Sequence, residues 1–249
     1  MGKRITFGPM YKPAALAGEY GEWALNIYKG CPHHCTYCYV PGVLRTSREE
    51  WQAQAVTPRV TVEQVRRGAK RMVSQGHTER VFLCFTCDPY GAQPAHDITR
   101  EIIQAITGEG LGVTVLTKAG AIACRDMDLL AASDSTFWAT LVTLDEQKSR
   151  EWEPGAAPPW ARVANLLKAR NMGIPTSISM EPVIWPEDAL DVIREYGGAV
   201  DMVHVGKLNH GPLPAPVDWR KFCQDAQDVA REAGANLKFK SSLREYQEA

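Results

Sequence analysis

Short apolar runs alternate with helical patterns along most of this chain, and this alternation constrains the fold more than any other feature. Between the runs, apolar residues recur at helical spacing, as at Val62, Val65 and Ala69, which follow a capping box of Thr61 and Gln64. The runs read as near-continuous apolar strands at Trp23–Tyr28, Val81–Phe85, Val113–Lys118, Phe137–Thr143, Ile174–Ile184, Asp201–Lys207 and Asn236–Lys240. Strands of this kind are typical of a parallel sheet covered by helices. We therefore predict an α/β fold, a partial barrel of roughly six strand–helix units.

The composition bounds the organisation and the setting of the chain. With 249 residues, 45% hydrophobic content and no linker or repeat, residues 1–249 are expected to form a single domain, in which residues 200–249 complete the barrel and supply the substrate side. The formal net charge of −1 gives no global attraction for nucleic acid. No apolar run is long enough for a membrane span, and seven cysteines without a secretory signal favour reduced thiols in the cytoplasm.

Residues that can carry chemistry follow the predicted strands. In parallel α/β folds, sites form at the carboxyl ends of the strands. These ends carry, in chain order, the cysteine-rich loop 30–41, Thr86 with Cys87 and Asp88, Lys118, Thr143, Glu181, and Lys207 with Asn209. We therefore expect one site at this edge of the sheet.

The loop "GCPHHCTYCYVP" holds Cys31, Cys35 and Cys38 within eight residues. These thiols, with His33 or His34 as a fourth ligand, could bind zinc, although no second knuckle follows at finger spacing. Alternatively, three thiolates hold an iron–sulfur cluster and leave one iron open for another ligand. The spacing and the position after the first strand favour the cluster, and a zinc-stabilised binding module is the alternative of another class.

Several sequence blocks together resemble one enzyme family. The C-x-x-x-C-x-x-C loop, with Tyr37 before its last cysteine, resembles the cluster loop of radical S-adenosylmethionine (SAM) enzymes. The blocks "TCDPYGAQP", "TLVTLDEQKSREWEPGAAPPWARVANLL" and "GIPTSISMEPVI" look like those of spore photoproduct lyase and its bacterial and phage relatives. The resemblance runs from about Asn26 to Ile184.

This resemblance implies a 4Fe–4S cluster on Cys31, Cys35 and Cys38, with SAM bound at the open iron and cleaved to a 5′-deoxyadenosyl radical. It also implies an electron donor such as flavodoxin or ferredoxin. By position, the resemblance assigns cofactor contacts to Tyr37, to Thr86, Cys87 and Asp88 near the methionyl amino group, to Lys118 at the carboxylate, and to Thr143. Glu181 would accept from a ribose hydroxyl or fix Lys118, and a salt bridge to a helix is its alternative.

The sequence departs from the lyase pattern at one place. The hydrogen-donating cysteine of the lyase corresponds by position to Phe85, so repair of a thymine dimer is not expected. Cys87 and Tyr90 are then the candidate catalytic residues. Tyr90 would pass a hydrogen atom or stack on a base, or else pack against the barrel rim.

The resemblance implies a nucleobase substrate, thymine or a modified thymine in DNA or as a nucleoside. A base in the barrel mouth would depend on stacking and edge hydrogen bonds, so Tyr90 and Asn209, with Lys207 at the same strand end as Asn209, are the candidate substrate contacts. The neutral charge balance favours a base read in the barrel mouth over long duplex held by phosphates, and it leaves a peptide or small metabolite as the alternative. If a nucleic-acid backbone is bound, its phosphates would meet Arg45, Arg48, Arg59, Lys207, Lys238 and Lys240.

Overall fold

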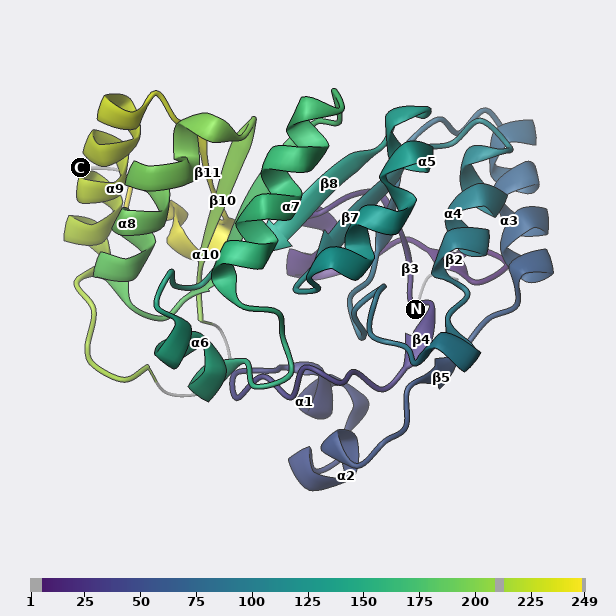
Figure 1. Ribbon diagram of the computed structural model, residues 1–249, viewed down its shortest axis with the longest axis horizontal. Helices are drawn as coiled ribbons and strands as arrows, with labels where there is room; N and C mark the ends of the chain where they lie inside the picture. Colours follow the sequence, from purple (N-terminus) through teal and green to yellow (C-terminus); the bar gives the residue numbers. More distant parts are fainter. Residues whose placement is uncertain (1–5, 209–212, 248–249) are drawn as a thin grey trace.

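A computed structural model describes residues 6–208 and 213–247, and one curved sheet runs through them (Figure 1). Its strand order is β1-β2-β3-β6-β7-β8-β9-β10-β11. The strands are β1 (Thr6–Phe7), β2 (Met10–Tyr11), β3 (Trp23–Leu25), β6 (Val81–Leu83), β7 (Val113–Thr117), β8 (Thr136–Thr140), β9 (Thr176–Val183), β10 (Met202–Lys207) and β11 (Leu237–Phe239).

Within this sheet, the strands in the order β3-β6-β7-β8-β9-β10-β11 are all parallel, and each pairs with the strand beside it in that order. This arrangement confirms the predicted α/β fold. The antiparallel pair β1–β2 at one edge was not predicted, nor was the separate ribbon of β4 (Tyr28–Lys29) and β5 (Thr57–Pro58). Strands of two residues are too short to carry a periodic signal. That residues 1–249 form a single domain stays a prediction.

Helices lie along the outer side of the curved sheet, and α1 and α2 lie below it with the cysteine loop (Figure 1). On α3, Val65, Ala69 and Met72 are buried, and Thr61 and Gln64 form the predicted capping box. The α-helices are α1 (Val40–Leu44), α2 (Arg48–Gln52), α3 (Val62–Ser74), α4 (Thr99–Thr107), α5 (Met127–Ala131), α6 (Glu146–Trp152), α7 (Pro159–Asn171), α8 (Pro186–Tyr196), α9 (Trp219–Ala233) and α10 (Ser241–Arg244). In the described part of the chain, no helix has the length and apolar character that crossing a bilayer requires.

An aromatic stack fills part of the concave side of the sheet. The rings of Trp138 on β8 and His204 on β10 are stacked with centroids 4.2 Å apart. Strand β9 lies between them, and its small residues Ser177 and Ser179 leave room for the two rings to meet. Thr140 and Gly206 lie two residues further along β8 and β10 than the stacked rings, on the same face of the sheet, and they line a cavity at the carboxyl ends of the strands. The stack therefore lies directly beneath that cavity.

Candidate active site

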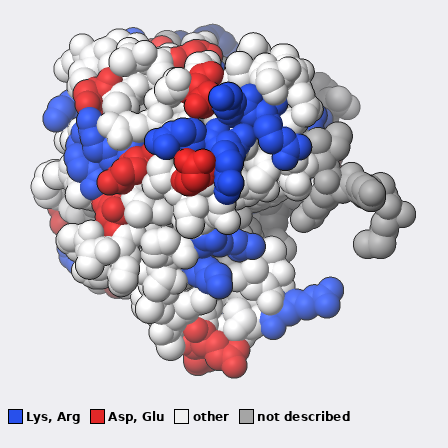
Figure 2. All heavy atoms as spheres, turned by 90° about the vertical axis from the view of Figure 1, so that its right-hand side faces the viewer, with Lys and Arg blue, Asp and Glu red and all other residues white. Residues whose placement is uncertain are grey.

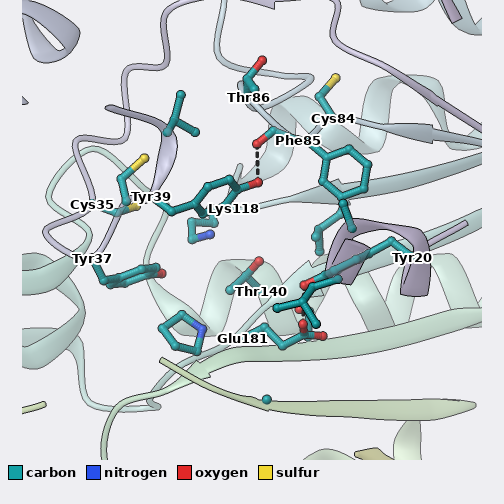
Figure 3. A pocket seen from close by; sticks show the side chains of 18 of the residues that line it. Tyr20, Cys35, Tyr37, Tyr39, Cys84, Phe85, Thr86, Lys118, Thr140 and Glu181 are labelled. Carbon is teal, nitrogen blue, oxygen red and sulfur yellow. Dashed lines mark hydrogen bonds between the residues drawn. The ribbon is translucent and has the colours of Figure 1, made fainter. Parts of the chain in front are cut away.

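A cavity of about 310 Å³ lies at the carboxyl ends of β6 to β10. In Figure 3, Cys35, Tyr37 and Tyr39 lie on one side of it, Tyr20 and Glu181 on the other, and Lys118 and Thr140 between them. The structure therefore brings together most of the residues that the sequence selected. Those lining the cavity are Cys31, Cys35, Tyr37, Cys38, Thr86, Cys87, Asp88, Lys118, Glu181 and Lys207.

The cysteine loop is held by backbone contacts from two directions. The guanidinium of Arg48 donates to the carbonyls of Cys35 and Cys38, at 3.0 and 3.1 Å. On the other side, the backbone N–H of Gly155 donates to the His33 carbonyl at 2.9 Å. A Cβ at Gly155 would lie 2.0 Å from the Pro32 carbonyl oxygen, so only glycine fits at this approach. The loop is thus a preformed cradle that presents three thiols to one cavity.

The donor set fits a cluster better than a single zinc ion. His33, a candidate fourth zinc ligand, has both ring nitrogens occupied: Nδ1 donates to the Gly155 carbonyl and Nε2 pairs with Asp88, each at 2.9 Å. Within residues 6–208 and 213–247, no three Cys, His, Asp or Glu side chains converge as ligands of one ion. In an iron–sulfur cluster, each cysteine binds a different iron atom, so the three thiols need not converge on one point.

Burial keeps the free thiols of Cys31 and Cys35 protonated. It raises the pKa of Cys35 to about 12, although nearby Lys118 acts in the opposite direction. Burial also raises the pKa of Cys31, and the charge of Asp88 raises it further. Because thiolates are the cluster ligands, binding must supply the positive charge that displaces these protons.

Lys118 belongs to a buried charge network rather than to the solvated surface. Its Nζ lies 3.9 Å from a carboxylate oxygen of Glu153 and 5.7 Å from the ring centroid of Tyr37. Glu153 also accepts from the Tyr37 hydroxyl and, at 2.5 Å, from Arg162. Burial alone would lower the pKa of Lys118, but Cys35, when it is a thiolate, and the Glu153 carboxylate raise it overall. The cavity thus contains a protonated ammonium group beside the cysteine loop.

Asp88 joins the cysteine loop to the ends of β6 and β7. It accepts from the backbone N–H groups of Tyr90 and Lys118 and from the Thr117 hydroxyl. Burial alone would raise the pKa of Asp88, but the pairing with His33 and these hydrogen bonds lower it to about 2. Asp88 is therefore ionised and fully bonded, and the adjacent Thr86 and Cys87 also line the cavity.

The far wall of the cavity holds a second buried charge cluster. The Tyr20 hydroxyl donates to Glu181, and the ammonium of Lys240 lies 3.5 Å from the other oxygen of that carboxylate. Lys240 also lies 3.5 Å from the ring centroid of Tyr20. Glu181 therefore pairs with Lys240 and does not fix Lys118. Nearby, the Nζ of Lys207 donates to the Tyr246 hydroxyl at 3.2 Å.

Two sequence-based assignments are wrong in position, and one lies outside the described residues. Strand β8 ends at Thr140, so Thr143 lies in the following turn, where its hydroxyl accepts from the Asp145 N–H and donates to Asp188. Tyr90 does not line the cavity. Its side chain is buried, and burial together with the neighbouring Asp126 carboxylate raises its pKa. Asn209 falls outside the described residues.

The sequence analysis missed residues at both ends of the cavity. Glu153 and Arg162 lie nine residues apart within the block "WEPGAAPPWAR", which is part of the resemblance, and they form a buried ion pair. Their opposite charges within that block were the signal that could have identified them. Thr140 is the β8 hydroxyl that faces the cavity. Tyr20 has no local signal, because only the fold brings it to Glu181. Lys240 was predicted as a phosphate contact and not as the partner of Glu181.

Comparisons with known proteins agree with this arrangement. A model described as "Radical SAM superfamily" matches residues 25–196. An uncharacterized protein of Acidianus two-tailed virus is 25% identical over 219 residues, which are 78% of this chain and 71% of that protein.

Two solved structures share the fold. Streptococcus suis SuiB bound to S-adenosylmethionine has a TM-score of 0.66 at 15% identity and covers 87% of this chain, which spans about half (49%) of SuiB. Spore photoproduct lyase complexed with dinucleoside spore photoproduct has a TM-score of 0.66 at 14% identity, over 92% of this chain and 80% of the lyase.

Proposed function

The chain belongs to the radical SAM superfamily, and from that premise we propose that it acts on a nucleobase, thymine or a modified thymine, in DNA or as a nucleoside. It is an enzyme, and its cofactors are a 4Fe–4S cluster and SAM. When bound, the cluster supplies the electron that cleaves SAM to methionine and a 5′-deoxyadenosyl radical, which takes a hydrogen atom from the substrate.

The aromatic wall of the cavity is the observation that carries the proposal. Tyr20, Phe82 and Phe85 line the cavity together, with ring centroids 5.2 Å (Tyr20 to Phe82), 4.5 Å (Phe82 to Phe85) and 5.5 Å (Tyr20 to Phe85) apart. Aromatic faces of this kind hold flat bases by stacking, which is worth about 1–3 kcal/mol per base. The neighbouring Glu181 and Lys240 offer an acceptor and a donor to the edge of such a base.

The cavity residues divide into a cofactor side and a substrate side. Cys31, Cys35 and Cys38 would bind the cluster, and Lys118 would donate a charged hydrogen bond to the SAM carboxylate. On the same side, Tyr37 holds Glu153, which positions the Lys118 ammonium. Thr86 and Cys87, which line the cavity, would contact the amino group of SAM, and Thr140 would replace Thr143 as the hydroxyl contact from β8.

The solved lyase complex supports the substrate class. That protein binds a dinucleoside photoproduct, and this chain covers 80% of it. By the sequence resemblance, Phe85 corresponds to the donor cysteine of the lyase, and its ring packs against Phe82 in the aromatic wall. We therefore propose modification or rearrangement of a base rather than repair of a dimer.

A peptide substrate is the second candidate. SuiB has also been solved with its precursor peptide SuiA, at a TM-score of 0.64 and 18% identity over 87% of this chain. This chain spans 48% of that protein, so the remaining half of SuiB has no counterpart in the comparison. The aromatic wall favours a base over an extended peptide.

Two features of the setting complete the proposal. A small electron carrier such as flavodoxin or ferredoxin would reduce the cluster. All seven cysteines are free thiols, which supports a reducing compartment such as the cytoplasm.

Anaerobic production of 5′-deoxyadenosine tests the proposal. Thymidine, oligothymidylate or modified-thymine substrates should stimulate production above the level without substrate, whereas peptides should not. Phe85→Ala should weaken the response to substrate by about 5- to 150-fold in KM, which corresponds to one stacking contact. Trp160→Ala removes an exposed ring outside the cavity and should leave KM unchanged. Stimulation by peptides alone, or equal behaviour of the two variants, would show that the substrate is not a base.

A further inference from the structure

A second cavity, of about 550 Å³, lies beside α3 on the face shown in Figure 2, where Lys and Arg side chains gather. It belongs to no part of the active site described above. Its lining includes Arg59, Arg67, Arg71 and Gln64, with Tyr11 and Asn26. Within the described part of the chain, no Asp or Glu lines it.

Close backbone packing forms this hollow. The turn between β1 and β2 crosses α3 at Gly68, where a Cβ would lie 2.3 Å from the Phe7 carbonyl oxygen. Gln64, Arg67 and Arg71 border the hollow from the same face of α3, since Arg67 lies three residues after Gln64 and four residues before Arg71. From the loop before α3, the backbone N–H of Arg59 donates to the Ile27 carbonyl at 2.8 Å, which fixes Arg59 near the carboxyl end of β3.

The arginines carry more positive charge than their neighbours neutralise. Arg67 has an exposed partner, Glu63, at 3.7 Å. Among the described residues, neither Arg59 nor Arg71 has an ion pair with a carboxylate, and Arg71 lies over the Phe7 ring at 5.7 Å. Three guanidinium groups with one carboxylate partner leave an excess of about two charges, which suits a phosphate group that accepts from guanidinium forks.

Tyr11 offers this cavity a neutral hydrogen-bond donor, and Asn26 connects the cavity to the active site. Asn26 donates to the Tyr11 hydroxyl oxygen at 2.9 Å, which leaves the hydroxyl hydrogen available to a ligand. The Asn26 side-chain oxygen accepts from the backbone N–H groups of Phe85 and Thr86, at 2.8 and 2.9 Å. Phe85 and Thr86 line the active site, so Asn26 lies between the two cavities.

We propose that the cavity of Arg59, Arg67 and Arg71 is a phosphate-binding site for the substrate, so that the base entering the active site belongs to a nucleotide or a nucleic-acid strand. This inference rests on the proposed nucleobase function. It adds a binding site for the phosphate of the substrate, which the net charge of −1 for the whole chain does not indicate. The local excess charge, rather than the composition, decides the electrostatics at this edge. Phosphate contacts would position the strand, and the aromatic wall would read the base.

Binding measurements with matched charge removal test the site. Labelled oligothymidylate is titrated onto anaerobically reconstituted protein across a salt series, with thymidine, thymidine monophosphate and inorganic phosphate as competitors. Arg59→Gln/Arg71→Gln should weaken oligothymidylate binding at least tenfold and flatten the salt dependence by about 1.4 in slope, or about 0.7 per lost contact on a single strand. Arg66→Gln/Lys70→Gln removes the same charge from α3 outside the cavity and should weaken binding less than twofold.

The competitors distinguish a nucleotide from a nucleic-acid strand, and the variants distinguish the phosphate site from the proposed nucleobase function. Competition by thymidine monophosphate that the arginine variant loses identifies a nucleotide, whereas arginine-dependent binding of oligothymidylate with which thymidine monophosphate does not compete identifies a strand. Equal weakening in both double variants, or in neither, overturns the site. Arg59→Gln alone, checked by an unchanged SAM affinity, guards against misfolding. Arginine-dependent binding without 5′-deoxyadenosine production keeps the site and rejects the proposed function, whereas stimulation by thymidine without arginine-dependent binding does the reverse.

Discussion

At Lys118, a buried ammonium keeps its charge because other buried charges surround it. Its side chain is 18% exposed, yet Cys35 and Glu153 raise its pKa against the effect of burial. Such a group interacts strongly with a carboxylate ligand, since the surrounding medium screens weakly. Glu153 retains Arg162 when Lys118 is removed, so substitution leaves no unpaired buried charge.

Lys118→Ala should therefore weaken SAM binding by about 1.5–3 kcal/mol, the value of a charged hydrogen bond, while the visible spectrum of the cluster stays unchanged. Equilibrium binding of SAM to reconstituted protein measures this loss. Lys168→Ala, on the exposed side of α7, is the matched control and should bind SAM like the wild type. An unchanged affinity in Lys118→Ala would remove Lys118 from the cofactor side of the cavity.

At the scale of single elements, strand β10 contains a histidine that the fold keeps neutral. Burial lowers the pKa of His204 to about 3, and the charges of Lys240 and Lys238 act in the same direction. The unfolded chain takes up this proton below about pH 6.5, whereas the folded chain does so only near pH 3. The contribution of His204 to the unfolding free energy therefore has its full value above about pH 6.5 and decreases as the pH falls towards 3.

Between pH 7 and pH 5, the wild type should lose about 2 kcal/mol of unfolding free energy through His204 alone. His204→Phe retains a ring against Trp138 and should lack this part of the pH dependence. Anaerobic urea unfolding at the two pH values measures the difference. The exposed His96→Phe should behave like the wild type, and the same slope in all three proteins would show that His204 is protonated in the fold.

The loop between α6 and α7 supports the cysteine loop through Gly155. Gly155→Ala would place a methyl group against the Pro32 carbonyl, and moving backbone to relieve such overpacking costs about 1–3 kcal/mol. We expect reconstituted Gly155→Ala to contain several-fold less iron and sulfide per chain. Gly42→Ala, where nothing lies within 4 Å of the added carbon, should contain the wild-type amount. Wild-type iron and sulfide content in Gly155→Ala would mean that the cysteine loop binds the cluster even when the Pro32 backbone is displaced.

Sequence reasoning predicted elements well and their ends poorly. Apolar runs and helical spacing located β6 to β11, because buried strands and amphipathic helices carry periodic signals. Thr143 was misplaced because the ladder with β9, not the apolar run, ends β8 at Thr140. Tyr90 was misplaced because the direction of a side chain after a strand depends on tertiary packing. Cys31, Cys35 and Cys38 were selected because their spacing is itself a local signal, and all three line the cavity. That they bind the cluster stays a prediction.

At the scale of the whole molecule, the far wall of the cavity unites distant parts of the chain. Glu181 on β9 lies between Tyr20 and Lys240, and the backbone N–H of Ser241 donates to Glu19 across 222 positions of sequence. No sequence pattern links these residues. Their ion pair is buried, so removing one partner leaves the other without compensation.

Lys240→Met should therefore destabilise the fold by about 3–5 kcal/mol, and Glu181→Gln in the same chain should recover much of that loss. The double-mutant cycle of unfolding free energies measures the coupling. Lys221→Met breaks an exposed pair with Asp225 and should leave the unfolding free energy close to that of the wild type. Additive effects at positions 181 and 240 would show that the two groups do not interact.

The strand order has a consequence for how the protein is made. Each parallel strand joins the one synthesised before it, so the sheet can grow during translation. The cysteine loop leaves the ribosome about two hundred residues before Lys240 and Ser241, which complete the cavity. At about 5–20 residues per second, the nascent thiols remain uncovered on that side for about 10–40 s. During this interval, the side of the loop that faces the later cavity is open both to cluster insertion and to oxidation of the thiols.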